Sequence, residues 1–199
     1  MKIGIIPRIR IFKRKQIEYC VERKLILFLK KVYKNPKIIV LNESKKNYSL
    51  NILIISGGND LTIFSKSKEN IIKNNITNFY LKKAIGKNII IIGICYGAQF
   101  IGKYFKSVLK KTSKHVGQHK IKFESISFNS KLKKEAITNS YHNYLIKSLG
   151  NKLIPLAKAG DGSIEAFMHS RLNIYGIMWH PERSNSTKYF DNIYFKKFK

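Results

Sequence analysis

Short apolar runs alternate with amphipathic stretches in the first half of this chain. The apolar runs, each short enough to be a buried strand, are residues 1–6, 37–41, 51–56 and 88–94. The stretches with apolar side chains at helical spacing are residues 16–33, 68–85 and 98–109. Buried strands that alternate with helices predict an α/β fold, with a mostly parallel central sheet flanked by helices.

The second half of the chain has a less regular pattern. Its short strand candidates are residues 120–123, 126–128, 153–157, 164–169 and 174–178. Glycine-containing turns such as residues 160–162 separate several of them, which predicts hairpins added to the edge of the sheet. Because no internal repeat or linker interrupts the 199 residues, we expect a single domain over residues 1–199.

A net charge of +28 is the unusual feature of the composition. A basic surface attracts phosphate, so nucleic-acid binding is one interpretation. The other is compositional, since the chain is rich in Lys, Ile and Asn, which AT-rich codons encode. The basic residues are scattered along the whole chain, and lysine far outnumbers arginine, the residue that nucleic-acid readers favour. We therefore favour composition over a nucleic-acid partner, while a role in capturing a phosphate-bearing substrate stays open.

Other parts of the composition exclude some classes. Cys20 and Cys95 form no CxxC pair and have no nearby histidine at zinc-site spacing, so no metal or organic cofactor is expected. No apolar run approaches the roughly 20 residues that a membrane span needs. The N-terminus places basic residues after a very short apolar run, unlike a signal peptide. These patterns predict a cytoplasmic protein with no membrane partner.

The strongest local motif is Gly-Ile-Cys-Tyr-Gly-Ala-Gln at residues 93–99. It follows a buried strand, opens a helix, and places glycine two residues before and two residues after Cys95. This pattern is typical of a nucleophile elbow, a sharp turn that exposes one reactive side chain. A cysteine at a helix N-terminus is also favoured in its reactive thiolate form.

Two further segments supply what a cysteine nucleophile needs. His180 follows the apolar run 174–178, and Glu182 lies two residues later, where a carboxylate could orient the imidazole. The pair Gly57-Gly58 ends another buried strand, so it should lie beside the elbow at the carboxyl edge of the sheet. The backbone N–H groups of Gly58 and Tyr96 are our candidates for an oxyanion hole.

Together these segments resemble the class I glutamine amidotransferase superfamily. The motif around Cys95 and the sequence His-Pro-Glu at residues 180–182 occur in the right order, and the resemblance spans nearly the whole chain. It implies the flavodoxin-like fold of that superfamily and a catalytic triad of Cys95, His180 and Glu182.

Within the superfamily the chain resembles the γ-glutamyl hydrolase branch, which is peptidase C26-like. Glutaminase subunits of histidine and anthranilate synthesis tend to have a Pro-Gly loop where this chain has Gly57-Gly58. Segments 139–143, 164–167 and 176–180 also look like that branch. The resemblance implies a pocket for the glutamyl group lined by Gly57, Gly58, Asn59, Gln99, Ser140, Tyr141 and His142. His119 falls where the family has a recurring histidine, to which we assign no chemistry.

The resemblance implies a hydrolase acting on the carbon–nitrogen bond of a γ-glutamyl amide, through a glutamyl thioester. Its partner would be a small γ-glutamyl substrate, which could carry a nucleotide. A glutaminase subunit that passes ammonia to a separate synthetase is one alternative. A catalytically inactive basic binding protein on the same fold is another, although the intact Cys–His–Glu set argues against it.

Overall fold

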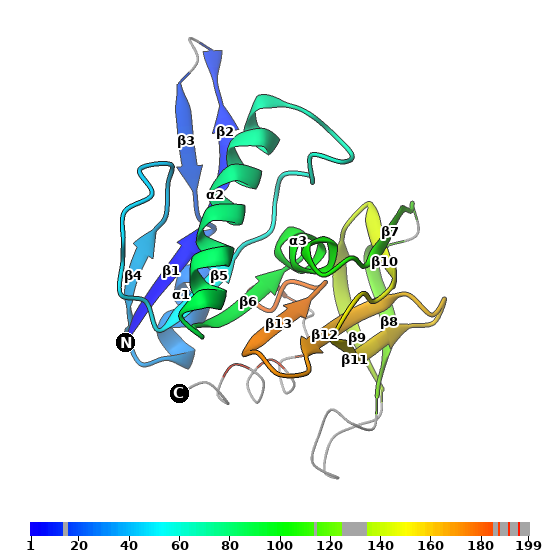
Figure 1. Cartoon of the computed structure of the whole chain (residues 1–199). Coiled ribbons are helices and arrows are strands. Elements are labelled where there is room, and N and C mark those ends of the chain that lie inside the picture. The colour runs from blue at the N-terminus through cyan, green and yellow to red at the C-terminus, as the bar shows by residue number, and fades with distance from the viewer. Residues whose placement is uncertain are drawn as a thin grey trace.

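The computed structural model describes residues 1–13, 16–113, 115–124 and 135–184, together with residues 187, 191 and 195. In this part of the chain, five parallel strands lie side by side in the order β4-β1-β5-β6-β13 (Figure 1). Their bounds are Lys2–Ile6 for β1, Lys37–Val40 for β4, Ile52–Ile55 for β5, Ile90–Ile94 for β6 and Ile174–Ile177 for β13. They fall on the predicted apolar runs, and the predicted α/β fold with a parallel central sheet is confirmed.

Helices cover both faces of this parallel part. They are α1 at Arg23–Val32, α2 at Lys68–Gly86 and α3 at Tyr96–Tyr104. The apolar face of α1 packs in one core with alternate residues of the strands, while α2 and α3 pack in a second core on the opposite face. The crossovers β1 to β4 and β5 to β6 run in opposite directions along the sheet. This change of direction opens a crevice at the carboxyl ends of β1 and β5, where such folds bind ligands. No helix among the described residues is long and apolar enough to span a membrane.

Antiparallel strands extend the sheet beyond β13, as the sequence predicted. From β13 outward they are β12 at Ile164–His169, β11 at Leu153–Ala159, β8 at Val116–Phe123 and β9 at Glu135–Tyr141. A further strand, β10 at Tyr144–Ser148, pairs with β12 and with β7 at Val108–Lys111. The predicted strand 126–128 lies outside the described residues.

The helix expected over residues 16–33 is partly wrong. It begins only at Arg23, and the preceding residues form β3 at Ile17–Cys20. This strand pairs with β2 at Arg8–Ile11 in an antiparallel ribbon that extends beyond the carboxyl end of β1 (Figure 1). The apolar side chains of β3 happen to continue the helical spacing of α1, but pairing with β2 overrides that local pattern.

The helix expected over residues 98–109 is also shorter than predicted. It starts at Tyr96 and ends at Tyr104, and the chain then turns at Lys106, which has a left-handed φ of 67°. Ser107 accepts a hydrogen bond from the Gly150 N–H at 2.9 Å, which fixes the turn into β7. Val108 and Leu109 therefore belong to a strand, although their spacing fitted the helix.

Candidate active site

Cys95 occupies a strained turn between β6 and α3. Its backbone has φ 51° and ψ −103°, a left-handed conformation that is uncommon for a residue with a side chain. A Cβ on Gly93 would lie 2.5 Å from the backbone carbon of Gly97, and a Cβ on Gly97 would overlap the backbone oxygen of Ile55. Both flanking glycines are therefore required for the turn. This is the geometry of the elbow that the motif predicted.

Hydrogen bonds hold both the backbone and the imidazole ring of His180 in place. His180 follows β13, the parallel neighbour of β6, so it emerges at the same edge of the sheet as Cys95. Its Nδ1 lies 2.6 Å from Oε1 of Glu182. The side-chain amide of Asn139 accepts from the His180 N–H and donates to its carbonyl oxygen, each at 2.9 Å. Asn139 thus fixes the backbone while Glu182 fixes the ring.

The thiol and the imidazole face one another. A Cβ on Gly57 would lie 3.2 Å from Nε2 of His180 and 3.5 Å from Cβ of Cys95, so both side chains converge on this glycine. Burial by itself would lower the pKa of His180. Hydrogen bonds and negative charge from Cys95 and Glu182 outweigh burial and raise this pKa to about 9. A charged imidazole beside a cysteine is the arrangement that cysteine hydrolases use.

The double-glycine loop after β5, Gly57-Gly58, lies beside the side chains of Cys95 and His180. Because β5 lies between β1 and β6, its carboxyl end reaches the elbow directly. Gly58 has a left-handed φ of 77°, and a Cβ there would lie 2.7 Å from Cδ of Arg8. A residue with a side chain would therefore meet both backbone strain and a steric clash.

A buried lysine that the sequence did not single out lies beneath this loop. The ammonium group of Lys73, on α2, donates to the carbonyl oxygens of Ser56, Gly57 and Gly58 at 3.0, 2.8 and 2.7 Å. It also lies 4.2 Å from the ring centroid of Tyr96. Burial lowers the pKa of Lys73 well below its usual value, although negative charge at Cys95 opposes this effect. Because Lys73 binds three successive carbonyl oxygens, it fixes the backbone conformation of the loop. No sequence signal separates Lys73 from the many other lysines.

The predicted substrate-binding residues divide into two sets. Gly58, Asn59, Gln99, Tyr141 and His142 line a pocket of about 480 Å³ that also contains Cys95 and His180. Gly57 lines an adjoining pocket of about 240 Å³, which shares Arg8, Gly58, His180 and Arg183 with the first. Ser140 is buried, and its hydroxyl donates to the carbonyl oxygen of His115 at 2.6 Å, so it supports the wall instead of lining either described pocket.

Several pocket side chains already form contacts within the protein. The amide of Asn59 pairs with the backbone of Ile9 through both its oxygen and its nitrogen, at 2.8 and 3.0 Å. The Gln99 amide donates to the carbonyl oxygen of Tyr144 at 2.8 Å. Tyr141 is 47% exposed, and the guanidinium of Arg183 lies 4.6 Å from its ring centroid. Tyr141 is therefore a wall residue that a ligand can reach.

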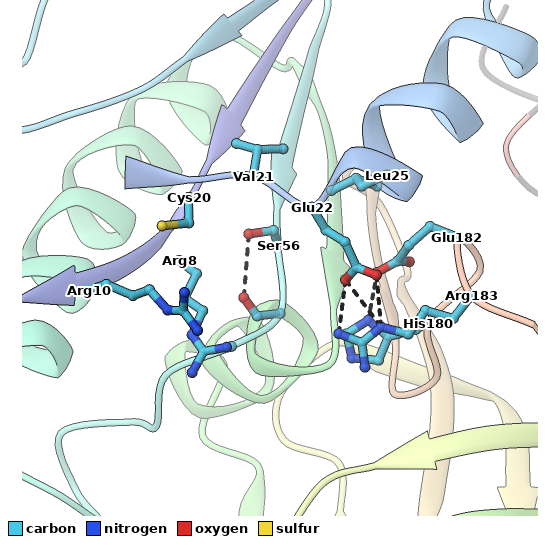
Figure 2. Close-up of a pocket in the computed structure, with 12 residues that line it drawn as sticks. Arg8, Arg10, Cys20, Val21, Glu22, Leu25, Ser56, His180, Glu182 and Arg183 are labelled. Carbon is cyan, nitrogen blue, oxygen red and sulfur yellow. Dashed lines mark hydrogen bonds and ion pairs between the residues drawn. The ribbon is translucent and has the colours of Figure 1, made fainter. Parts of the chain in front are cut away.

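Arginines surround the smaller pocket (Figure 2). Arg8 and Arg10 reach into it from β2, on the side opposite His180. Arg183 lies beside His180, where its guanidinium forms an ion pair with Glu22 at 2.9 Å. Within the described residues neither Arg8 nor Arg10 has a carboxylate partner. Their charges are available to an anionic group of a ligand, and the sequence did not single them out.

A parallel α/β sheet that presents a buried cysteine on an elbow, beside a histidine–glutamate pair, defines the class of cysteine-dependent amide hydrolases. The comparisons with known proteins agree with this class. Residues 12–199 match the model of the family "Glutamine amidotransferase class-I", and the chain belongs to that family.

The individual relatives carry the names of different enzymes. The chain is 36% identical over 163 residues to the gamma-glutamyl-CDP-amidate hydrolase of Campylobacter jejuni, covering 80% of this chain and 78% of that protein. It is 30% identical over 159 residues to one subunit of the glutamine-hydrolyzing GMP synthase of Methanococcus vannielii, covering 76% of this chain and 77% of that protein. A crystal structure of a putative GMP synthase subunit from Thermoplasma acidophilum superposes with a TM-score of 0.76 at 22% identity. That superposition covers 100% of this chain and 93% of the other, which supports the fold.

Proposed function

We propose that this chain hydrolyses a γ-glutamyl amide bond through a glutamyl thioester on Cys95. The thiolate attacks the γ-carbonyl carbon, and the N–H groups of Gly58 and Tyr96 stabilise the resulting oxyanion. His180 donates its proton to the departing nitrogen, so the amine leaves and the thioester remains. His180 then takes a proton from water, whose oxygen attacks the thioester to release glutamate and restore the thiolate. Glu182 orients His180 and stabilises its charged form.

The convergence of Cys95 and His180 at Gly57 is the observation that carries this proposal. It joins an elbow, an acid–base group and its orienting carboxylate at the carboxyl edge of three neighbouring parallel strands. Hydrolysis of a γ-glutamyl amide by the purified chain, followed as glutamate release, is the direct test.

We expect activity to fall as the pH rises through about 9. His180 needs a proton to release the leaving group, and its pKa is about 9, above its ordinary value. Glu182→Gln removes a negative charge that raises this pKa, so the alkaline limb should move to lower pH. Profiles of kcat/KM against pH for both proteins measure the shift. Glu69→Gln, in the first turn of α2, is the matched control. An alkaline limb at the same pH in wild type and Glu182→Gln would contradict the assignment.

On the amine side of the bond we propose a phosphate-bearing, nucleotide-type leaving group. Arg8 and Arg10, without carboxylate partners in the described part of the chain, flank the smaller pocket next to His180. The similarity to the gamma-glutamyl-CDP-amidate hydrolase of Campylobacter jejuni supports the same assignment. The chain would then release glutamate from a γ-glutamyl nucleotide amidate in capsule phosphoramidate synthesis, in the cytoplasm.

Arg10→Gln tests this assignment without altering the packing of Arg8 on Gly58. A hydrogen bond to a charged group contributes about 1.5 kcal/mol or more, so we expect KM for γ-glutamyl-CDP-amidate to rise about tenfold. KM for glutamine, which has no phosphate, should rise much less. Arg171→Gln, an exposed arginine outside both pockets, is the control. Equal increases in KM for the two substrates would argue against a phosphate contact.

A second candidate is a glutaminase subunit that delivers ammonia to a synthetase. The similarity to the GMP synthase subunit of Methanococcus vannielii favours it. Such a protein should be nearly inactive alone on both glutamine and γ-glutamyl-CDP-amidate, whereas a free-standing hydrolase should turn over one of them without a partner. The hypothesis of an inactive basic binding protein predicts no thiol reactivity at Cys95, together with salt-sensitive binding to nucleic acid.

A further inference from the structure

A cluster of three histidines and one glutamate lies in the antiparallel part of the sheet and carries out no step of the proposed hydrolysis, although His142 also lines the larger pocket. His115 precedes β8, His119 lies on β8, His142 follows β9, and Glu165 lies on β12. The side chains of His115, His142 and Glu165 are 4%, 1% and 0% exposed, and that of His119 is 17% exposed. Three segments of the chain thus place these groups together in the protein interior.

The facing atoms are close but are not hydrogen-bonded. Nδ1 of His115 and Nε2 of His142 lie 3.2 and 3.6 Å from Oε1 of Glu165, and Nε2 of His119 lies 3.4 Å from Oε2. Each of these five buried atoms lacks a partner with hydrogen-bond geometry among the described residues. Buried polar atoms that face one another without hydrogen bonds indicate that a further group, such as an ion, binds between them.

The outer hydrogen bonds of the histidines indicate what that partner is. Nδ1 of His142 lies 3.1 Å from the carbonyl oxygen of Tyr144, which can only accept, so this nitrogen carries a hydrogen. Nε2 of His115 lies 3.0 Å from a carboxylate oxygen of Asp161 and carries one for the same reason. In neutral imidazoles the inward nitrogens of His115 and His142 therefore present lone pairs to Glu165, itself an acceptor. Protons on all the inward nitrogens would instead bury up to three positive charges around one carboxylate.

We propose that this cluster binds a Zn²⁺ ion, with His115, His142 and Glu165 as ligands and His119 completing the set. Zinc bonds of about 2.0–2.2 Å to nitrogen and oxygen give tetrahedral edges of about 3.3 Å, close to the separations of 3.2 and 3.6 Å between Oε1 of Glu165 and the inward nitrogens of His115 and His142. Nε2 of His119 lies 3.4 Å from the other oxygen, Oε2. The inward atoms of His115, His142 and Glu165 all lie within 4.8 Å of one another. Imidazole and carboxylate donors suit zinc.

The contacts around the cluster are those of a metal site. Asp161 accepts from the outer nitrogen of His115, the carboxylate–histidine–metal arrangement that fixes the tautomer of a ligand. Ser140 holds the backbone of His115 from β9. The ion would join β8, β12 and the connection between β9 and β10. Because Tyr141 and Tyr144 on either side of that connection line the larger pocket, zinc would fix this pocket wall from behind.

The test measures binding of Zn²⁺ alone to the full-length chain. Glu22, His180 and Glu182 also bring ligand atoms within 4.8 Å of one another, so the background is Cys95→Ala with His180→Ala, which removes metal binding at the active site. After metal removal and desalting, this protein should bind close to one zinc per chain in competition with a chromophoric chelator. Less than half a zinc per chain under these conditions would overturn the proposal.

Asp161→Asn is the variant in which we expect weaker zinc binding. The side chain of Asp161 is 43% exposed, and asparagine keeps the oxygen that accepts from Ser163 while losing the acceptor for His115. We expect zinc to bind about 10- to 100-fold more weakly. His169→Asn is the matched control, since His169 is a buried histidine outside the cluster whose Nδ1 only accepts from backbone N–H groups. Affinity unchanged in Asp161→Asn, or reduced equally in His169→Asn, would count against the site.

A third measurement needs no substitution in the cluster. Removing zinc should lower the melting temperature of the same background protein, and adding zinc should restore it, because the ion binds the folded state preferentially. An identical melting temperature with and without zinc would contradict the proposal. Loss of hydrolysis by wild type on γ-glutamyl substrates would not affect these results, so the two proposals fail separately.

Discussion

Cys95→Ala is expected to lower kcat for γ-glutamyl amide hydrolysis by about 10⁴-fold or more. Loss of the nucleophile removes the covalent route, and what remains is the contribution of substrate binding and the oxyanion contacts, as in other triad hydrolases. The measurement is glutamate release by the two purified proteins at saturating substrate. Acid quenching during turnover should also trap a glutamyl adduct on wild type, detectable by intact mass, and none on Cys95→Ala.

Cys20 provides the control for thiol chemistry. It lies on β3 in the wall of the smaller pocket, and it is a partly buried free cysteine. Cys20→Ala should keep kcat within about twofold and should still form the adduct. Comparable activity in Cys95→Ala and wild type would refute the proposed mechanism, whatever the substrate.

Gly97→Ala is expected to destabilise the protein by about 3 kcal/mol or more. The added Cβ would overlap the backbone oxygen of Ile55, and a backbone atom in a central strand cannot move aside as a side chain can. For a chain of this length such a loss lowers the melting temperature by about 6–12 °C. Thermal and urea unfolding measure it. The same overlap displaces the start of α3, so the thiol of any folded protein should react more slowly.

Gly86→Ala is the matched control because Gly86 also lies on a helix. No atom lies within 4 Å of the position of its Cβ, and alanine is the better helix former. This variant should be as stable as wild type or more stable by up to about 1 kcal/mol. Equal effects of the two substitutions would show that backbone freedom, and not the contact with Ile55, decides the stability at Gly97.

The parallel centre of the fold and the convergence at Gly57 were predictable because each depends on short segments. A strand buried on both faces is a continuous apolar run, and each chemically important residue follows such a run. Parallel neighbours then bring Cys95, His180 and the double-glycine loop to one edge. The order of the segments along the chain is enough to place them, without any knowledge of side-chain contacts.

The features that the sequence missed depend on contacts between distant segments. Strand β3 was predicted as helix because Ile17 and Cys20 continue the spacing of α1, while its pairing partners on β2 start at Arg8. Lys73 and Asn139 act through backbone groups of other segments, which leaves no local pattern. The histidine–glutamate cluster draws on three segments, and His142 and Glu165 are too far along the chain from the His115–His119 pair for the set to form a sequence motif.

The β2–β3 ribbon also bears on how selectivity can change in this family. It is inserted between β1 and α1, and it carries Arg8 and Arg10, whereas Cys95, His180 and Glu182 follow other strands. Under the proposed function, substitutions on the hairpin should alter which amine is released without changing Cys95, His180 or Glu182. Grafting hairpins from relatives that act on different γ-glutamyl compounds is accordingly a rational route to redesigned substrate range in this scaffold.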